Sequence, residues 1–433
     1  MLSSKKGRAE TAGDDMYRLA EELWPIGRSL SGPGVRETLM ILKRELGNLE
    51  LSHFRSGTKV FDWVVPNEWK VNSAKLIGPL GQTICDYAIN NLCLVGQSIP
   101  VVGKFTLEAL EPHLFSLPEQ EDAVPYVTSY YEDNWGFCLR HVDRMNLASG
   151  TYNVEIDTEI GPGKLDYGEL VIPGKSKREI FFSTYICHPS MANNELSGPV
   201  LAVQLAKHLQ KMNNFYTYRF IFIPETIGSI AYMAANLSHM KKNMLAGFVL
   251  TCVGDERAYS YIPSRKGGTI ADLAALSTFE ELGISPILYG WQDRGSDERQ
   301  YCSPGADLPV CSVTRSKYGT YSEYHTSLDT LGEVVTAEGL QGSFDFYRAL
   351  IRKLDTQRFP RMTVVGEPQL GKRGLYPNTS IKDAYADVRS VMDFISMLDG
   401  TIETEDAIKK SGVDKAHGHA FLNRLIEEEL VEN

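Results

Sequence analysis

The stretch Ile180-Phe-Phe-Ser-Thr-Tyr-Ile-Cys-His-Pro-Ser-Met-Ala-Asn-Asn-Glu-Leu-Ser-Gly198 decides the expected fold. It starts with an apolar run that ends at Cys187, which is typical of a strand buried on both faces. A polar loop begins at His188, and apolar residues recur at helical spacing after Gly198. Because α/β sheets place their active sites in such strand-to-helix loops, we expect His188 and Glu195 to belong to the functional site.

Strands and helices alternate along the chain that follows this stretch. Alternation of this kind predicts a mostly parallel sheet with helices on both faces. Two amphipathic helices, at 14–27 and 35–46, precede it. The other expected strands are at 180–187, 218–223, 247–253 and 310–313. The other expected helices are at 198–212, at 270–282 and at 336–355, with one more that follows residues 224–229 and ends at about residue 239. The expected fold class is therefore α/β, with a mixed, mostly parallel sheet.

Residues 58–165 have a different sequence pattern, with little sign of helix. Short alternating segments are separated by Gly and Pro, which predicts a β-rich domain inserted between residues 1–57 and 166–357. Within it, Pro125-Tyr-Val-Thr-Ser-Tyr-Tyr131 is rich in aromatic residues. This segment suits either a platform for a carbohydrate or peptide, or ordinary sheet packing.

The C-terminal part of the chain has a linker signature followed by a compact helical pattern. Residues 357–383 are rich in Pro, Gly, Arg and Lys and predict a linker, and residues 380–433 resemble a winged helix. The last helix region, 414–429, carries two Lys/Arg against four Asp/Glu. A helix that enters the DNA major groove should be basic, so we expect packing or protein docking and no nucleic-acid partner.

Composition narrows the function classes. The chain has 433 residues, 43% of them hydrophobic, and a net charge of −11, which argues against general nucleic-acid binding. Its seven cysteines form no CxxC pair, which indicates free thiols in a reducing compartment.

No apolar run is long enough to span a membrane and the N-terminus lacks a signal-peptide pattern, so we expect a cytoplasmic protein. Assembly into a homo-oligomer stays open.

The ends of several expected strands carry residues suited to zinc. His188 and Glu195 follow one strand, Glu225 and Asp255 follow two others, and His325 follows the last. In a parallel sheet these ends converge on one crevice. Catalytic zinc takes imidazole and carboxylate ligands and leaves a position for water, so His188, Glu195 and His325 would form a ligand set for one Zn²⁺. Glu225 would then be the general base that accepts the proton of water.

Further residues near these positions are candidates for supporting or substrate-binding roles. Asp329 could accept a hydrogen bond from a ligand imidazole and fix its tautomer. Tyr324 precedes His325 directly. Arg294 and Arg299 could pair with a substrate carboxylate, and salt bridges within the protein would explain them equally well. On spacing alone, structural roles for both histidines stay open, because no HExxH pattern is present.

The order of these motifs resembles the co-catalytic zinc aminopeptidases over roughly residues 14–55 and 170–355. The resemblance is carried by His188, Asn-Asn-Glu-Leu-Ser-Gly198, Pro-Glu225-Thr-Ile-Gly-Ser, Cys-Val-Gly-Asp255 and Tyr-His325-Thr-Ser-Leu-Asp-Thr330. Nearly the whole chain is similar to a bacterial family of polysaccharide-biosynthesis proteins with an aminopeptidase-like domain, an inserted β domain and a C-terminal winged helix. His188-Pro-Ser-Met-Ala and Trp135-Gly-Phe-Cys are among the segments specific to that resemblance.

Departures from the two-metal pattern bear on the mechanism. Asn194 stands where the aminopeptidases have a bridging Asp, Thr226 where they have a Glu ligand, and Thr251 where they have an Asp ligand. Asp255 lies four positions after Thr251 and would substitute only in part. With three ligand positions neutral, two adjacent dications would lack balancing charge, so the resemblance implies a single zinc, as in metallocarboxypeptidases. Asn194 would orient Glu195 or the substrate.

Two functions follow as expectations. The first is a single-zinc amide hydrolase, aminopeptidase-like, carboxypeptidase-like or a deacylase, acting on a small peptide or an acylated or sugar-linked substrate. Its link to surface polysaccharide biosynthesis comes from the resemblance alone. The alternative is a catalytically inert, aminopeptidase-like module that recognises a glycan precursor or a protein partner. A DNA-binding regulator would rest on the C-terminal helices alone.

Overall fold

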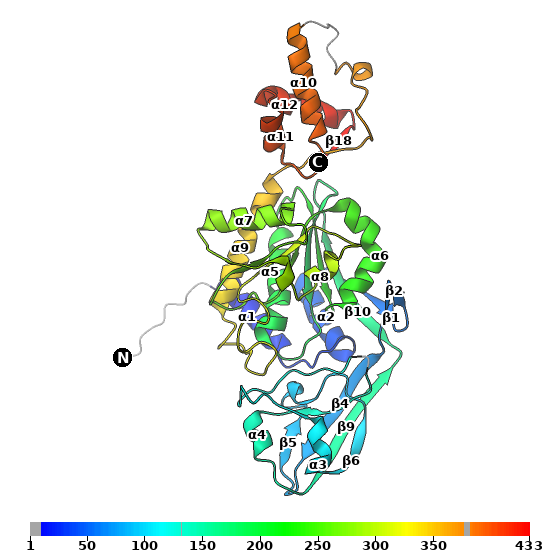
Figure 1. Ribbon diagram of the computed structural model, residues 1–433, viewed down its shortest axis with the longest axis vertical. Helices are drawn as coiled ribbons and strands as arrows, with labels where there is room; N and C mark the ends of the chain where they lie inside the picture. Colours follow the sequence, from blue (N-terminus) through cyan, green and yellow to red (C-terminus); the bar gives the residue numbers. More distant parts are fainter. Residues whose placement is uncertain (1–9, 131, 376–381) are drawn as a thin grey trace, which may run out of the picture. The chain divides into compact units, whose positions relative to one another are not determined.

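The computed structural model describes residues 10–130, 132–375 and 382–433 (Figure 1). The chain forms two compact units, Met1–Ala349 and Leu350–Asn433. Each unit has a hydrophobic core of its own. The candidate site lies entirely in the first.

The first unit is organised on an eight-stranded sheet with the order β1-β10-β12-β11-β13-β16-β14-β15. Its four central strands run parallel: β12 (Thr217–Ile223), β11 (Glu179–Tyr185), β13 (Met244–Val249) and β16 (Val310–Thr314). Antiparallel pairs add β10 (Lys164–Ile172) and β1 (Glu50–Arg55) on one side and β14 (Ser260–Ile262) on the other, and β15 (Ile287–Leu288) runs parallel to β14. The expected mixed, centrally parallel α/β fold is confirmed.

Strand β11 is apolar throughout because both faces of the sheet are covered. Every residue of β11 is buried. Phe181 faces one side and meets Tyr232 and Tyr301, with ring centroids 6.3 and 5.3 Å away. Phe182 points the opposite way and meets Tyr347 at 6.2 Å. Since successive residues of a strand alternate between faces, a continuous apolar run is what a central strand requires.

Helices surround this sheet on both faces (Figure 1). The capping box of Thr11 and Asp14 starts the first helix, and Thr269 with Asp272 starts α7 in the same way. Thr336 caps α9 by accepting the Gly339 N–H at 2.9 Å. The helices of this unit's main layer are α1 (Ala12–Leu23), α2 (Pro33–Leu46), α5 (Ser197–Leu209), α6 (Ile227–Asn243), α7 (Ile270–Leu282), α8 (Glu298–Tyr301) and α9 (Ala337–Thr356).

The expected β-rich insert forms a sheet of its own within the first unit. It is antiparallel with the order β5-β4-β9-β6. The strands are β4 (Glu68–Ile77), β5 (Thr83–Asp86), β6 (Val101–Thr106) and β9 (Thr151–Gly161). Shorter elements complete this part: β2 (Lys59–Val60), β3 (Trp63–Val64), α3 (Leu107–Leu110), β7 (Leu114–Phe115), β8 (Phe137–Cys138) and α4 (His141–Met145).

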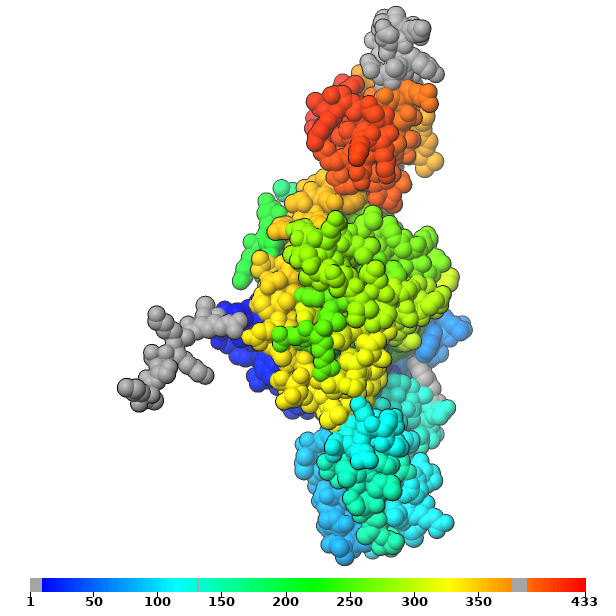
Figure 2. Space-filling view, turned by 60° about the vertical axis from the view of Figure 1, so that its left-hand side comes forward, coloured from blue at the N-terminus to red at the C-terminus, as the bar shows by residue number. Residues whose placement is uncertain are grey.

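One segment of the insert is bonded to the loop that carries His325. Val124 and Ser327 exchange two hydrogen bonds of 2.9 Å, and the Tyr126 N–H donates to the His325 carbonyl at 2.9 Å. Figure 2 shows cyan residues of the insert against the yellow residues that follow β16. The insert is therefore part of the framework of the site.

The second unit contains a small sheet and three helices. Strand β17 (Arg361–Met362) pairs with β18 (Val431–Glu432), and the helices are α10 (Lys382–Ser396), α11 (Thr404–Ser411) and α12 (Lys415–Glu427). Leu370 and Leu375 are buried in its core with Phe394 and Leu425. The prediction that residues 357–383 are a linker is thus wrong for 361–375, where β pairing and burial outweigh a polar composition. Residues 376–381 lie outside the described residues.

Two further expectations concern cysteines and membranes. All seven cysteines are buried and free. Among the described residues no helix combines the length and apolar character that crossing a membrane requires.

Gly198, at the start of α5, lies so close to Leu250 and Thr184 that a larger residue should disturb the packing. A Cβ at this position would lie 2.2 Å from the Leu250 carbonyl oxygen and 2.4 Å from Thr184 Oγ1. Gly198→Ala should therefore lower the free energy of unfolding by about 1–3 kcal/mol, because two backbones must separate. Chemical denaturation followed by tryptophan fluorescence measures this in the first unit, where all five tryptophans lie. Gly305→Ala, which meets nothing within 4 Å, is the control. Equal stabilities would contradict the close packing.

Candidate active site

A cavity of about 330 Å³ opens at the carboxyl ends of the parallel strands. It brings together three of the residues expected at the site, His188, Glu225 and His325, which lie far apart in the sequence. Its wall consists of Leu30, Trp63, Tyr126, Thr128, Tyr130, Cys187, His188, Glu225, Thr226, Ile227, Arg299 and His325. The converging strand ends are therefore the place where the chain assembles its chemistry.

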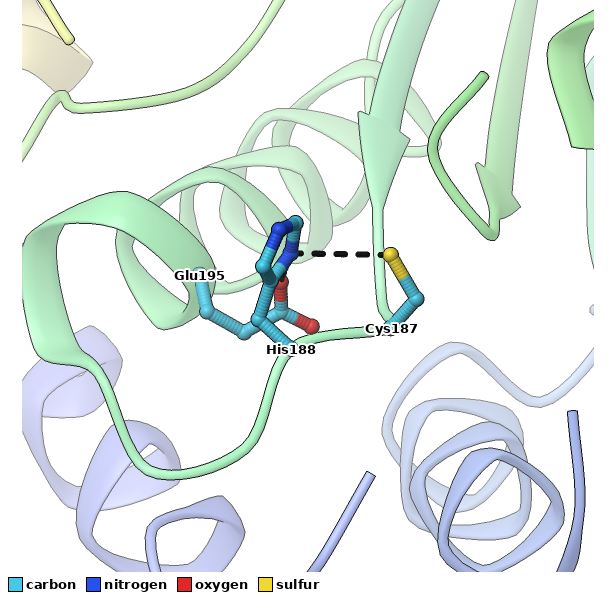
Figure 3. Close-up of side chains that lie close together, drawn as sticks. All are labelled: Cys187, His188 and Glu195. Carbon is cyan, nitrogen blue, oxygen red and sulfur yellow. Dashed lines mark hydrogen bonds and ion pairs between the residues drawn. The ribbon is translucent and has the colours of Figure 1, made fainter. Parts of the chain in front are cut away.

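The two nitrogens of His188 have different surroundings. Nδ1 lies 2.9 Å from Glu195 Oε2 and 3.5 Å from Cys187 Sγ. Nε2 lies on the cavity side, 3.7 Å from Glu225 Oε2. Figure 3 shows Glu195 and Cys187 beside the imidazole of His188, at the loop between β11 and α5. Glu195 therefore holds the imidazole in place from the side away from Glu225.

A buried arginine stands behind this pair. Arg28 Nε lies 3.5 Å from Glu195 Oε1, and both side chains are fully buried. The same Nε donates to the His188 carbonyl at 2.8 Å, and Nη1 donates to the Leu23 carbonyl at 2.8 Å. Burial raises the pKa of Glu195 to about 8, and the charge of Arg28 opposes that rise. Arg28 was not among the predicted site residues, because nothing in a turn between two helices distinguishes it.

His325 is held in an unusual backbone conformation. Its φ is 57°, and its carbonyl accepts the Tyr126 N–H at 2.9 Å. The ring stacks on Tyr324, with centroids 3.9 Å apart, and meets the edge of Tyr126 at 5.3 Å. Its buried Nε2 has no hydrogen-bond partner among the described residues. A strained backbone and an unpartnered polar atom at one residue indicate a functional constraint.

Burial keeps both imidazoles neutral. It lowers the pKa of His188 to about 3, with the charge of Arg28 as the second cause, and that of His325 to about 3, with the nearby His188 as the second cause. The ring centroids lie 5.5 Å apart. Two neutral imidazoles side by side offer lone pairs to a cation rather than protons to an anion.

Glu225 follows β12 and faces the same cavity. Its Oε1 accepts from Ser296 Oγ at 3.2 Å, and its N–H donates to Cys187 Sγ at 3.2 Å. Burial, with the charge of Asp297 second, raises the pKa of Glu225 to about 8. The next residue, Thr226, has a φ of 61°, and its N–H donates to Asp297 Oδ1 at 2.8 Å. Asp297 therefore secures the turn that presents Glu225, a role that was not predicted.

Two other predicted residues, Asp255 and Asp329, stabilise loops. The Asp255 carboxylate accepts hydrogen bonds from Asn193, Arg257 and Ser316. Asp329 accepts the N–H groups of Asn193 and Asn194 at 2.8 and 2.9 Å and the Tyr321 hydroxyl at 3.1 Å. The hydrogen bonds described for Asp329 run to loop groups, and the carboxylate that lies against His188 Nδ1 is Glu195.

Asn194 is buried and is not part of the described cavity wall. Its Oδ1 accepts from the Tyr185 hydroxyl at 3.2 Å, its carbonyl accepts from Thr251 Oγ1 at 3.1 Å, and its buried Nδ2 has no partner among the described residues. Asn194 and Thr251, two of the neutral substitutions, are thus in contact with each other. Neither carries the charge that a second dication would require.

The predicted arginines differ in position. Arg299 lines the cavity, and its Nη2 donates to Thr226 Oγ1 at 2.8 Å. Arg294 lies over the ring of Trp291 at 4.7 Å and is outside the cavity wall. Of the aromatic segment in the insert, Tyr126 and Tyr130 line the cavity with their hydroxyls 3.1 Å apart. Tyr131 lies outside the described residues.

The residue types at the site are ones that zinc binds. Neutral imidazoles and carboxylates are its usual donors. The predicted set of His188, Glu195 and His325 does not form one compact group: in the described chain, the group whose ligand atoms lie within 4.8 Å of one another is Cys187, His188 and Glu195. Burial raises the pKa of the Cys187 thiol, so it stays protonated unless a cation is bound.

Comparison with known proteins identifies the relatives of this chain. Residues 17–357 match the model of a domain of unknown function, DUF4910, and residues 358–433 match a winged helix-turn-helix model. A Clostridium acetobutylicum protein, named a candidate polysaccharide biosynthesis protein with an aminopeptidase-like domain, is 40% identical over 408 residues, which cover 94% of this chain and 93% of the relative.

Solved structures agree with this match. The crystal structure of a candidate peptidase from Clostridium acetobutylicum superposes with a TM-score of 0.79 at 38% identity, covering 97% of this chain and 96% of that one. A zinc aminopeptidase from Bacillus subtilis shares the fold alone, with a TM-score of 0.57 at 14% identity over 79% of this chain and 94% of that one. The chain therefore belongs to the DUF4910 family, with an aminopeptidase-like fold and a C-terminal winged helix.

Proposed function

We propose that the protein is an amide hydrolase that depends on one zinc ion and uses Glu225 as its general base. The observation that carries the proposal is the 3.7 Å approach of Glu225 Oε2 to His188 Nε2, in a cavity that His325 also lines. Both imidazoles are neutral and Glu225 is the one acidic side chain in the described cavity wall. This set supports metal-assisted hydrolysis over acid–base chemistry by protonated histidine.

His188 and His325 would hold the zinc, together with a carboxylate. Glu195 was expected to be that carboxylate, and its contact with His188 Nδ1 instead suits a residue that orients a metal-binding imidazole. Arg28 then balances the charge of Glu195 from behind. When bound, zinc would polarise the scissile carbonyl and lower the pKa of water.

Glu225 is placed to move the proton. Ser296 Oγ bonds Oε1, which leaves Oε2 directed toward His188. From there the carboxylate takes a proton from the attacking water and returns it to the leaving amine. Burial raises the pKa of Glu225, so the ionised form that a base requires would depend on a neighbouring cation.

The substrate class follows from the relatives only in outline. The Clostridium acetobutylicum relative is named for polysaccharide biosynthesis. We propose a small peptide or an acylated or sugar-linked amide as substrate, and the aromatic wall formed by Tyr126 and Tyr130 suits either.

A second candidate function rests on Arg28. Its guanidinium stands 3.5 Å from Glu195 and already supplies positive charge there. If that charge replaces a metal, the cavity would be a binding site without hydrolytic activity, which is the inert module considered above.

Zinc content separates the two candidates. We expect about one zinc per wild-type chain by elemental analysis, and a large loss in His188→Ala and in His325→Ala, because each removes a ligand. Glu195→Gln should weaken zinc affinity about 10- to 100-fold without abolishing binding, as loss of an orienting partner does. The exposed His53→Ala is the control. A wild-type protein without stoichiometric zinc would overturn the hydrolase proposal.

Glu225→Gln tests the base. The substitution keeps shape and hydrogen bonding but removes the proton acceptor, so kcat for amide cleavage should fall about 10²- to 10⁴-fold. Zinc content should stay at the wild-type level. Ser296→Ala, which removes only the 3.2 Å bond to Oε1, should cost far less and serves as the matched comparison. Loss of zinc in Glu225→Gln would instead make Glu225 a ligand.

A further inference from the structure

Arg299 presents a cation to the cavity with donors left unused. It lies on α8 and is exposed, and the one side-chain hydrogen bond that it makes in the described structure runs from Nη2 to Thr226 Oγ1 at 2.8 Å. It forms no ion pair with any described carboxylate. Some other arginines of this unit are paired with carboxylates, such as Arg257 with Glu323 at 2.8 Å and Arg36 with Glu68. The Nε and Nη1 donors of Arg299 are therefore free for a ligand.

The cavity offers little to a positively charged group. Among its described wall residues the acidic side chain is Glu225, which hydrolysis needs as a base. Glu195 lies on the far side of His188 and faces Arg28. A substrate ammonium group would find no spare carboxylate, whereas a substrate carboxylate would find Arg299. Arg299 is thus the group in the described wall that suits an anion, while Glu225 is reserved for the proton transfer.

The positions of Arg299 and Glu225 suit a substrate in which a carboxylate lies close to an amide. Arg299 bonds Thr226, and Thr226 directly follows Glu225. The anion site and the base are therefore neighbours, as the carboxylate and the amide of an N-acylated amino acid are. The rest of the wall includes Leu30, Trp63, Tyr130 and Ile227, which suit an apolar acyl group or side chain.

We propose that Arg299 binds the free carboxylate of the substrate, so that the site takes N-acylated amino acids or the C-terminal residue of a peptide. This inference rests on the proposed hydrolase function. Water adds to the amide carbonyl carbon and the C–N bond breaks. The proton that Glu225 accepts passes to the leaving nitrogen, giving a carboxylic acid and a free amino acid. The guanidinium forms charge-assisted, two-pronged hydrogen bonds to the carboxylate.

The test uses three matched probes: an N-benzoyl amino acid, its carboxamide, and the amide of the same amino acid with a free amine. Cleavage is measured for wild type, Arg299→Gln, Arg299→Lys and Arg294→Gln. Binding of the N-benzoyl amino acid and its carboxamide is measured by calorimetry on Glu225→Gln, with and without Arg299→Gln. Arg294 is the matched control, since it is an exposed arginine of the same segment outside the cavity wall.

The wild type should prefer the carboxylate probe over the carboxamide by about 10- to 100-fold in kcat/KM, the size expected for a charge-assisted pair. Arg299→Gln should remove that preference mainly through KM, Arg299→Lys should restore part of it, and Arg294→Gln should leave it unchanged. A preference for the free-amine probe, or a carboxylate preference that survives Arg299→Gln, overturns the inference.

Binding separates this inference from the proposed function. If no probe is cleaved while Glu225→Gln binds the carboxylate probe in an Arg299-dependent way, the hydrolase proposal fails and the carboxylate site stands. If the probes are cleaved equally well by wild type and Arg299→Gln, hydrolysis stands and the carboxylate site fails. Absence of both cleavage and binding overturns both.

Discussion

The site depends on the buried contact between Arg28, Glu195 and His188. A carboxylate in a dry interior is costly unless a positive charge and hydrogen bonds compensate it. Arg28 supplies the positive charge 3.5 Å from Glu195 Oε1, and the hydrogen-bonding contact of the carboxylate is with His188 Nδ1, 2.9 Å from Oε2. Arg28 also donates to the His188 carbonyl at 2.8 Å. It also bonds the Leu23 carbonyl, which ties the end of α1 to the loop after β11. The N-terminal helices therefore fix the imidazole that the proposed chemistry uses.

The opposite side of the cavity depends on the inserted domain. His325 has a positive φ, which a histidine adopts only where its surroundings hold it. The Tyr126 N–H bonds its carbonyl, and the Tyr126 ring meets both His188 and His325 at 5.3 Å. Insertion of a β-rich segment into an α/β fold thus has a direct consequence for the site. Without it, the two histidines would lack a common aromatic support.

Much of the fold could be predicted because buried faces of helices and strands require apolar residues at regular spacing in the sequence. The apolar run before His188, the alternation of strands and helices, and the winged-helix pattern all correspond to observed elements. Glu225 and both histidines were expected together because parallel strands end on one edge. The linker prediction failed at 361–375, since β17 pairs with β18, about seventy positions later, and local composition does not reveal a partner so distant in the chain.

By itself, the sequence determined which residue types follow the strand ends, and the resemblance to two-metal aminopeptidases showed that Asn194, Thr226 and Thr251 are neutral where that family has acidic residues. Only the tertiary structure decided that Glu195 contacts Nδ1 of His188, that Arg28 stands behind it, and that Arg299 and not Arg294 faces the cavity. The reason is physical. Residue identity and periodicity record which groups are buried, whereas the nitrogen that a carboxylate meets depends on side-chain direction and on packing between segments distant in the chain.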